Sequence, residues 1–177
     1  INHTETPSFV HSDDLMPDTH WFGGALLNYT EHIFRNKNAQ FPALIFKDEE
    51  GQTQTISWQE LETKTAALAD WLKHKGIKAG DSVVAYLPNI PEAIIAFLAA
   101  SSIGAIWSSC SPDFGTQSVV ERFQQIEPKI FFTIKDYQYN GKKFDKSEVV
   151  NGILAQLPTV IEVIDTARLA QICIESN

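Results

Sequence analysis

The sequence predicts an α/β fold: a doubly wound, mostly parallel sheet with flanking helices, preceded by an N-terminal arm and a β-hairpin. One observation is a strand–helix–strand unit over residues 80–113, where two short apolar runs enclose a segment that is apolar on every side. Such a unit implies parallel strands with a right-handed crossover. The other is that β-rich runs near residues 83, 105, 130 and 160 alternate with helical patterns, as in sheets covered by helices.

The first 20 residues carry two prolines and scattered polar residues without periodicity. We therefore expect an arm or linker over residues 1–20 and one incomplete α/β domain over residues 21–177. Trp21 and Phe22 are expected to pin the arm to the domain surface. The arm also holds three histidines without the spacing of ligands on one helix, so a metal site is disfavoured; they are His3, His11 and His20.

A short helix and a hairpin are expected before the sheet. Asn28 has Glu31 three positions on, which predicts a capped helix to about residue 36. Residues 43–47 and 53–58 are β-rich and flank a polar turn that contains a glycine. This arrangement predicts a β-hairpin.

The next segment predicts a long amphipathic helix. Ser57 and Glu60 have the spacing of a capping box. An apolar stripe follows at helical spacing and indicates one buried face; its members are Leu61, Thr65, Leu68 and Leu72. Gly76 ends the helix after a basic last turn that contains His74, so the helix dipole explains this histidine without a catalytic role.

The central unit begins with a strand over residues 83–87 that stops at a proline. Asn89 is expected to cap the following helix, whose residues 93–100 are apolar on every side and therefore buried. A strand over residues 105–107 follows. We expect an irregular loop over residues 108–114, at the carboxyl edge of the sheet where such folds bind ligands.

The alternation continues to the end of the chain. Ser118 and Glu121 match a second capping box. A polar, aromatic and basic loop is expected over residues 136–145. The expected elements are a helix from Thr116 or Ser118 to 126, a strand over 129–134, a helix that is capped by Ser147 and ends at about 157, a strand over 160–164 and a helix over 167–174.

Composition excludes several classes of function. The formal net charge is −8, from 14 basic and 22 acidic residues, which disfavours nucleic acid and membrane surfaces as partners. The longest apolar run is too short for a membrane span, and no signal peptide is expected. Cys110 and Cys173 lie far apart, without metal or disulfide spacing. We therefore expect a cytoplasmic location.

Two loops contain chemically active residue types. The segment 108–113, SSCSPD, has serines and a thiol, but a nucleophile needs a neighbouring base, and only His32 or His74 could provide one. A tight turn with Asp113 as a turn residue is favoured. The second loop, over residues 137–143, has tyrosines that can stack on a base and lysines that can pair with phosphate. The alternative interpretation of this loop is a solvated surface turn.

Common catalytic and phosphate-binding motifs are absent from the sequence. It contains neither GxGxxG nor GxxxxGK[ST], which are the usual phosphate cradles. It also lacks the GxSxG and HExxH motifs of hydrolases and metalloproteases. We therefore assign no catalytic residue and no metal ligand to this chain.

Residues 20–158 resemble the N-terminal part of the adenylate-forming acyl-CoA synthetases, or AMP-binding enzymes. Within that family the resemblance is strongest to the members that act on acetoacetate. The segments that carry it are WFGGALLNY from residue 21, YLPNIPEA from residue 86, GAIWSSCSPDFG from residue 104 and RFQQIEPKIFF from residue 122.

The resemblance implies a ligase that activates acetoacetate with ATP and Mg²⁺ to an acyl-adenylate, releases pyrophosphate and transfers the acyl group to CoA. It also implies that the phosphate loop, the metal-binding glutamate and the catalytic lysine lie downstream of the matched region. The chain would then be the first quarter to third of such an enzyme, inactive alone and with no tightly bound cofactor. Its partners would be small-molecule substrates and the C-terminal part of its own enzyme.

One family site falls inside the matched region. The resemblance assigns contacts with the CoA nucleotide to Tyr139, Asn140, Gly141 and Lys142. The family has an arginine at the position of Tyr139, so a positive charge remains only at Lys142. The alternative function is a self-contained, non-catalytic α/β module that binds a nucleotide or CoA.

Overall fold

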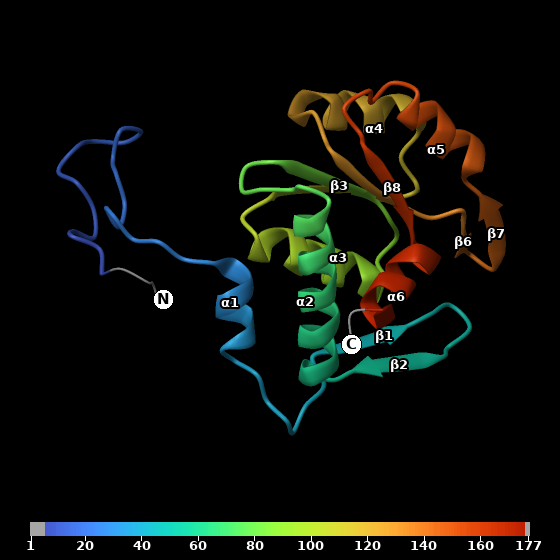
Figure 1. Cartoon of the computed structure of the whole chain (residues 1–177), viewed down its shortest axis with the longest axis horizontal. Coiled ribbons are helices and arrows are strands. Elements are labelled where there is room, and N and C mark those ends of the chain that lie inside the picture. Colours follow the sequence, from blue (N-terminus) through green and yellow to red (C-terminus); the bar gives the residue numbers. More distant parts are fainter. Residues whose placement is uncertain (1–5, 176–177) are drawn as a thin grey trace.

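A computed structural model describes residues 6–175 of the chain, and its centre is a four-stranded parallel sheet (Figure 1). The strand order is β4-β3-β5-β8, and every neighbouring pair is parallel. The doubly wound sheet is therefore confirmed. The strands are β3 (Ser82–Tyr86), β4 (Ile106–Cys110), β5 (Ile130–Thr133) and β8 (Glu162–Asp165).

Helices cover both faces of this sheet. Alternate strand residues point to opposite faces, so Phe132 packs with one group of helices and Phe131 with the other. The first group is α2 (Trp58–His74), α3 (Pro91–Ser102) and α6 (Thr166–Glu175). The second group is α4 (Thr116–Phe123), followed by the 3₁₀ turn η1 (Gln124–Ile126), and α5 (Ser147–Leu154).

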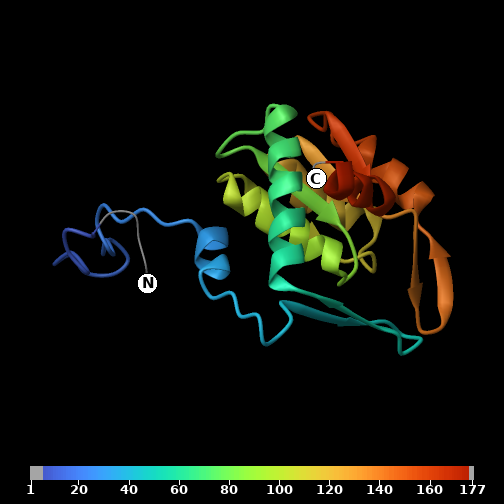
Figure 2. The same ribbon diagram turned by 60° about the horizontal axis from the view of Figure 1, so that its bottom comes forward.

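Two antiparallel hairpins extend from the layered body (Figure 2). The expected one consists of β1 (Leu44–Lys47) and β2 (Thr53–Ile56). The other, β6 (Asp136–Tyr139) and β7 (Lys142–Asp145), lies where the sequence predicted a loop over residues 136–145, so that prediction is wrong. A two-residue turn with positive φ closes it, and Asn-Gly is a preferred pair there.

Strand β4 is longer than expected. Residues 108–110 were predicted to begin a loop, but Ser109 and Cys110 pair with Ala85 and Tyr86 of β3. The pairing with a fully buried neighbouring strand outweighs the weak strand preference of the serines. The loop after β4 is therefore short and begins at Ser111.

Two of the predicted helix caps are confirmed. The Ser57 side chain accepts a hydrogen bond from the Glu60 backbone amide at 3.1 Å. The Asn28 side chain accepts one from the Glu31 amide at 3.1 Å, at the start of α1 (Tyr29–Phe34). In both cases the capping residue has the extended backbone that a cap requires.

Three other predicted caps are wrong. Ile90, not Asn89, precedes the first residue of α3, and no side chain caps that helix. Gly115 precedes α4, which begins at Thr116, so Ser118 lies inside its first turn. Ser147 is itself the first residue of α5. A capping side chain must sit on the residue before the helix, and spacing alone misplaced that residue here.

The arm folds on itself beside α1 (Figure 1). The Ser8 amide donates to the Gly23 carbonyl at 2.9 Å, and the Trp21 ring lies 5.7 Å from the His11 ring. Because Trp21 stays 58% exposed, it does not pin the arm to the domain, in contrast to the prediction. His3 lies outside the described residues.

The described residues give two further results about possible partners. Among residues 6–175, no three His, Cys, Asp or Glu side chains cluster as metal ligands would. Within the same range, no helix has the length and apolar character needed to cross a membrane.

Candidate functional site

The main candidate site is a cavity of about 710 Å³ at the carboxyl edge of the sheet. Segments that are distant in sequence line it: the turn of the β1–β2 hairpin, the loop after β3, the chain after β5 and the start of α6. Open α/β sheets bind ligands at this edge, because the loops that follow the strands converge there.

The charged side chains that line this cavity are mostly acidic. Five carboxylates contribute to it against one lysine; they are Asp48, Glu49, Glu50, Glu92 and Asp136, with Lys47. Carboxylates and phosphates are both negatively charged and repel each other. The cavity therefore does not suit the phosphate chain of ATP. Groups that can bind an anion lie instead at the turn of the β6–β7 hairpin.

That turn carries the four residues assigned to CoA by resemblance. Asn140 and Gly141 have φ of 50° and 69° and form the turn, with Tyr139 and Lys142 paired at the strand ends. The structure thus brings the four residues together on an exposed surface. The neighbouring Lys143 forms an ion pair with Asp136 at 3.1 Å, whereas Lys142 has no ion pair within residues 6–175.

A glutamate from the other hairpin already binds this turn. The Glu49 carboxylate accepts hydrogen bonds from the backbone amides of Asn140 at 2.8 Å and Gly141 at 2.9 Å. Sequence analysis missed Glu49, because 91 residues separate it from Asn140 and no local pattern indicates the contact. The amides nevertheless show that this turn accommodates a negatively charged group.

Asp113 connects the loop after β4 to the second hairpin. It accepts hydrogen bonds from the Tyr137 hydroxyl and from the Ser111 hydroxyl, the latter at 2.9 Å. These bonds, that of Tyr137 foremost, hold the pKa of Asp113 below its ordinary value of 3.8. The bond to Asp113 raises the pKa of Tyr137 to about 12. The hydrogen bond between Tyr137 and Asp113 therefore orients the β6–β7 hairpin at neutral pH.

Replacing Tyr137 by phenylalanine is expected to lower the free energy of unfolding by about 0.5–1 kcal/mol at neutral pH, because it removes this bond. The folded pKa of Asp113 is depressed, so its contribution exists above the ordinary pKa and is lost as the pH falls through the folded pKa. In urea denaturation, the difference in stability between wild type and Tyr137→Phe should therefore be full at neutral pH and shrink as the pH is lowered below 3.8. Tyr139→Phe is the control, and an equal loss there would contradict the assignment.

The loop after β4 has a structural role. Cys110 is 4% exposed, and burial raises the pKa of its thiol. The buried Tyr86 hydroxyl donates to the carbonyls of Pro112 at 2.8 Å and Phe114 at 2.9 Å, which fixes the loop. The two histidines considered as possible bases for a nucleophile here are His32, which lies on α1, and His74, which ends α2. These contacts support a tight turn over residues 111–114, whereas residues 108–110 belong to strand β4.

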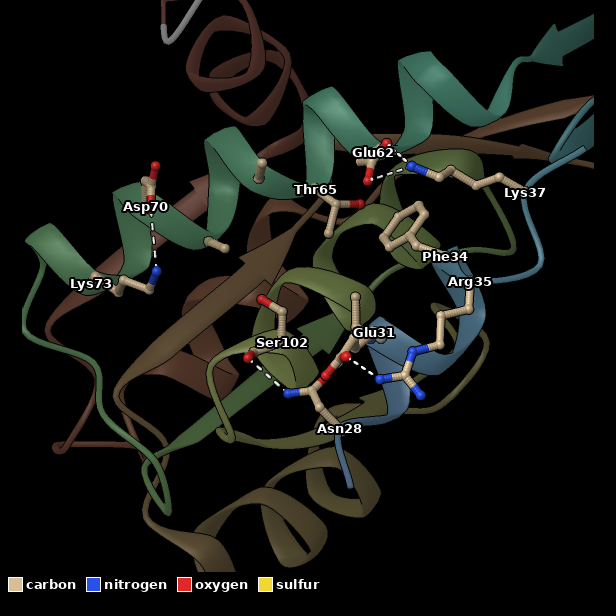
Figure 3. A pocket seen from close by; sticks show the side chains of 13 residues that line it. Asn28, Glu31, Phe34, Arg35, Lys37, Glu62, Thr65, Asp70, Lys73 and Ser102 are labelled. Carbon is tan, nitrogen blue, oxygen red and sulfur yellow. Dashed lines mark hydrogen bonds and ion pairs between the residues drawn. The ribbon is translucent and has the colours of Figure 1, made fainter. Parts of the chain in front are cut away.

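A second cavity, of about 720 Å³, lies between α1, α2 and the end of α3 (Figure 3). Its charged side chains pair with one another, as Lys37 does with Glu62 at 2.7 Å and Lys73 with Asp70 at 3.3 Å. The Thr65 hydroxyl is buried there and has no hydrogen-bond partner among residues 6–175. Since the charges are neutralised in pairs, this groove is the weaker candidate for binding an ionic ligand.

Comparison with known proteins gives consistent matches. A family model described as AMP-binding enzyme matches residues 32–175. The acetoacetyl-coenzyme A synthetase of Rhizobium meliloti (strain 1021) is 45% identical over 150 residues, which cover 84% of this chain and 23% of that protein. The acetoacetyl-CoA synthetase of Macaca fascicularis is 41% identical over 145 residues, covering 81% of this chain and 22% of that protein.

A solved structure matches as well. The acetoacetyl-CoA synthetase from Streptomyces lividans superimposes with a TM-score of 0.88 at 41% identity, covering 93% of this chain and 26% of that one. The chain thus spans 22–23% of the length of these two curated relatives. The matches lie in the N-terminal region of the longer proteins.

Proposed function

The chain belongs to the AMP-binding enzyme family, and we propose that it supplies the N-terminal α/β part of an acetoacetate–CoA ligase. The observation that carries this proposal is its 41–45% identity to proteins named acetoacetyl-CoA synthetase, together with the structural match at a TM-score of 0.88. The resemblance that the sequence indicated is thereby confirmed at the level of the family.

The complete enzyme would convert acetoacetate, ATP and CoA to acetoacetyl-CoA, AMP and pyrophosphate through an acyl-adenylate. The carboxylates of the carboxyl-edge cavity disfavour the phosphates of ATP, and no three potential metal ligands cluster among residues 6–175. We therefore propose that ATP and Mg²⁺ both bind to parts of the enzyme outside this chain, and that the chain alone is inactive. Its own contribution is the sheet, the carboxyl-edge cavity and the second hairpin.

The CoA nucleotide would contact the turn of the second hairpin. The amides of Asn140 and Gly141 point toward a carboxylate and can therefore donate to a phosphate instead. Lys142 adds a positive charge beside them, and the exposed Tyr139 ring offers a surface for stacking. The contact is expected to be weak in this chain, because only one lysine replaces the basic pair of the family.

The edges of the sheet favour a partial enzyme over a self-contained binding module. Strands β4 and β8 are the two edges, and each exposes apolar side chains, with Ile106 at 48% and Val163 at 43%. A self-contained fold normally protects such edges. We propose that the rest of the same enzyme covers them, and that the enzyme is cytoplasmic, in keeping with two unpaired cysteines.

Replacing Lys142 by alanine is expected to weaken CoA binding to this chain about three- to tenfold, because it removes one exposed phosphate-pairing charge. Weak binding is best followed by amide chemical shifts during a CoA titration. Lys143→Ala is the matched control, since that lysine already pairs with Asp136, and it should change the affinity less than about twofold. Equal affinities for wild type and Lys142→Ala would remove Lys142 from the CoA site.

A further inference from the structure

The tips of the two hairpins lie side by side in both views of the chain (Figures 1 and 2). The Glu49 carboxylate joins them, with one oxygen on the Asn140 amide and the other on the Gly141 amide, at 2.8 and 2.9 Å. The strand residues that precede the two tips, Phe46 and Lys47 in β1 and Asp136 to Gln138 in β6, line the same cavity. The contact therefore lies at the border of the cavity, which Glu49 itself lines.

The two amides form an anion site that belongs to the turn itself. In a two-residue turn with positive φ at both positions, the strand ends on either side pair with each other. The amides of the two turn residues are then free of that pairing and point outward together. Successive backbone amides arranged in this way bind carboxylate or phosphate groups.

Glu49 is not required for its own turn. Asp48 holds that turn, since its carboxylate accepts from the Gln52 amide at 2.8 Å and its carbonyl accepts from the Gly51 amide at 3.2 Å. The adjacent Glu50 is exposed and forms no hydrogen bond or ion pair with any residue of the described range. Glu49 and Glu50 thus carry the same charge in the same turn, and only Glu49 occupies the anion site.

We propose that Glu49 is an internal competitor for the anion site of the second hairpin. A phosphate group that binds the amides of Asn140 and Gly141 must displace the Glu49 carboxylate, and this separates the two hairpin tips beside the cavity. The inference rests on the proposed CoA contact only for the identity of the natural ligand. The competition itself concerns any phosphate-bearing anion.

The test compares wild type, Glu49→Gln, Glu49→Ala and the charge-matched control Glu50→Gln. Inorganic pyrophosphate and CoA are titrated separately, and the amide shifts of Asn140 and Gly141 are followed. Both Glu49 variants should shift these amides before any ligand is added. They should bind pyrophosphate about three- to tenfold more tightly than wild type, because a charged hydrogen-bond competitor is lost. Glu50→Gln should tighten binding less than about twofold, by reduced repulsion alone.

The outcomes separate this inference from the proposed function. Tighter pyrophosphate binding by the Glu49 variants without any CoA binding would support the competition and remove the CoA contact. Equal tightening by Glu49→Gln and Glu50→Gln would overturn the competition and leave a general charge effect. No pyrophosphate-dependent shift at Asn140 and Gly141 in any variant would also overturn it, whatever CoA does. Circular dichroism confirms that each exposed-turn variant is folded.

Discussion

Phe132→Ala is expected to lower the free energy of unfolding by about 3–5 kcal/mol, a large part of the roughly 5–15 kcal/mol by which ordinary domains are stable. Phe132 is fully buried in β5, an inner strand of the sheet, and is paired with Ala85 on one side and Ile164 on the other. Its ring also lies 6.3 Å from that of Trp107. Truncation would leave a cavity that rigid neighbouring strands cannot fill.

Urea denaturation followed by circular dichroism measures this loss. Ile106→Ala on the edge strand β4 is the comparison, because that side chain is 48% exposed and should cost less than about 1.5 kcal/mol. Phe132→Leu keeps most of the volume and serves if the alanine variant does not fold, with an expected cost of about 1–2 kcal/mol. Equal losses for Phe132→Ala and Ile106→Ala would contradict the sheet order described above.

The sheet could be predicted from sequence because its signals are local. The buried helix with its two flanking strands lies within about 30 residues, and the Ser57 cap acts over three positions. The second hairpin was missed although it carries an Asn-Gly turn, since its strands are polar and exposed and show no apolar alternation. The Asn-Gly turn therefore forms a hairpin, although the pattern of the two strands does not predict one.

The candidate site was predictable only in part. The turn residues Asn140 and Gly141 follow one another in sequence, so a motif could identify them. Glu49 and Asp113 reach the second hairpin from 91 and 24 positions away. Those contacts depend on how two hairpins and a loop pack at the carboxyl edge of the sheet. Nothing in the local sequence of either acid specifies this placement, and only the tertiary structure shows it.

An acetoacetate-dependent ATP–pyrophosphate exchange assay is expected to give background activity with this chain alone. The chain covers 23% of the Rhizobium meliloti relative, its sequence lacks a glycine-rich phosphate loop, and its cavity is lined by carboxylates that repel phosphate. The Rhizobium meliloti protein, named acetoacetyl-coenzyme A synthetase, is the positive control. Exchange above the level without acetoacetate would contradict the proposal that this chain is part of an enzyme and inactive alone.

A chimera provides the complementary measurement. This chain replaces the matched 150 residues of the Rhizobium meliloti protein, to which it is 45% identical. If the chain supplies the N-terminal scaffold of such a ligase, the chimera should exchange pyrophosphate within about a hundredfold of the relative, because small misplacements of catalytic groups cost about that much. The relative without those residues should be inactive. A folded chimera with no more exchange than the deletion variant would show that this chain cannot perform the scaffold's role, and the proposed function would fail.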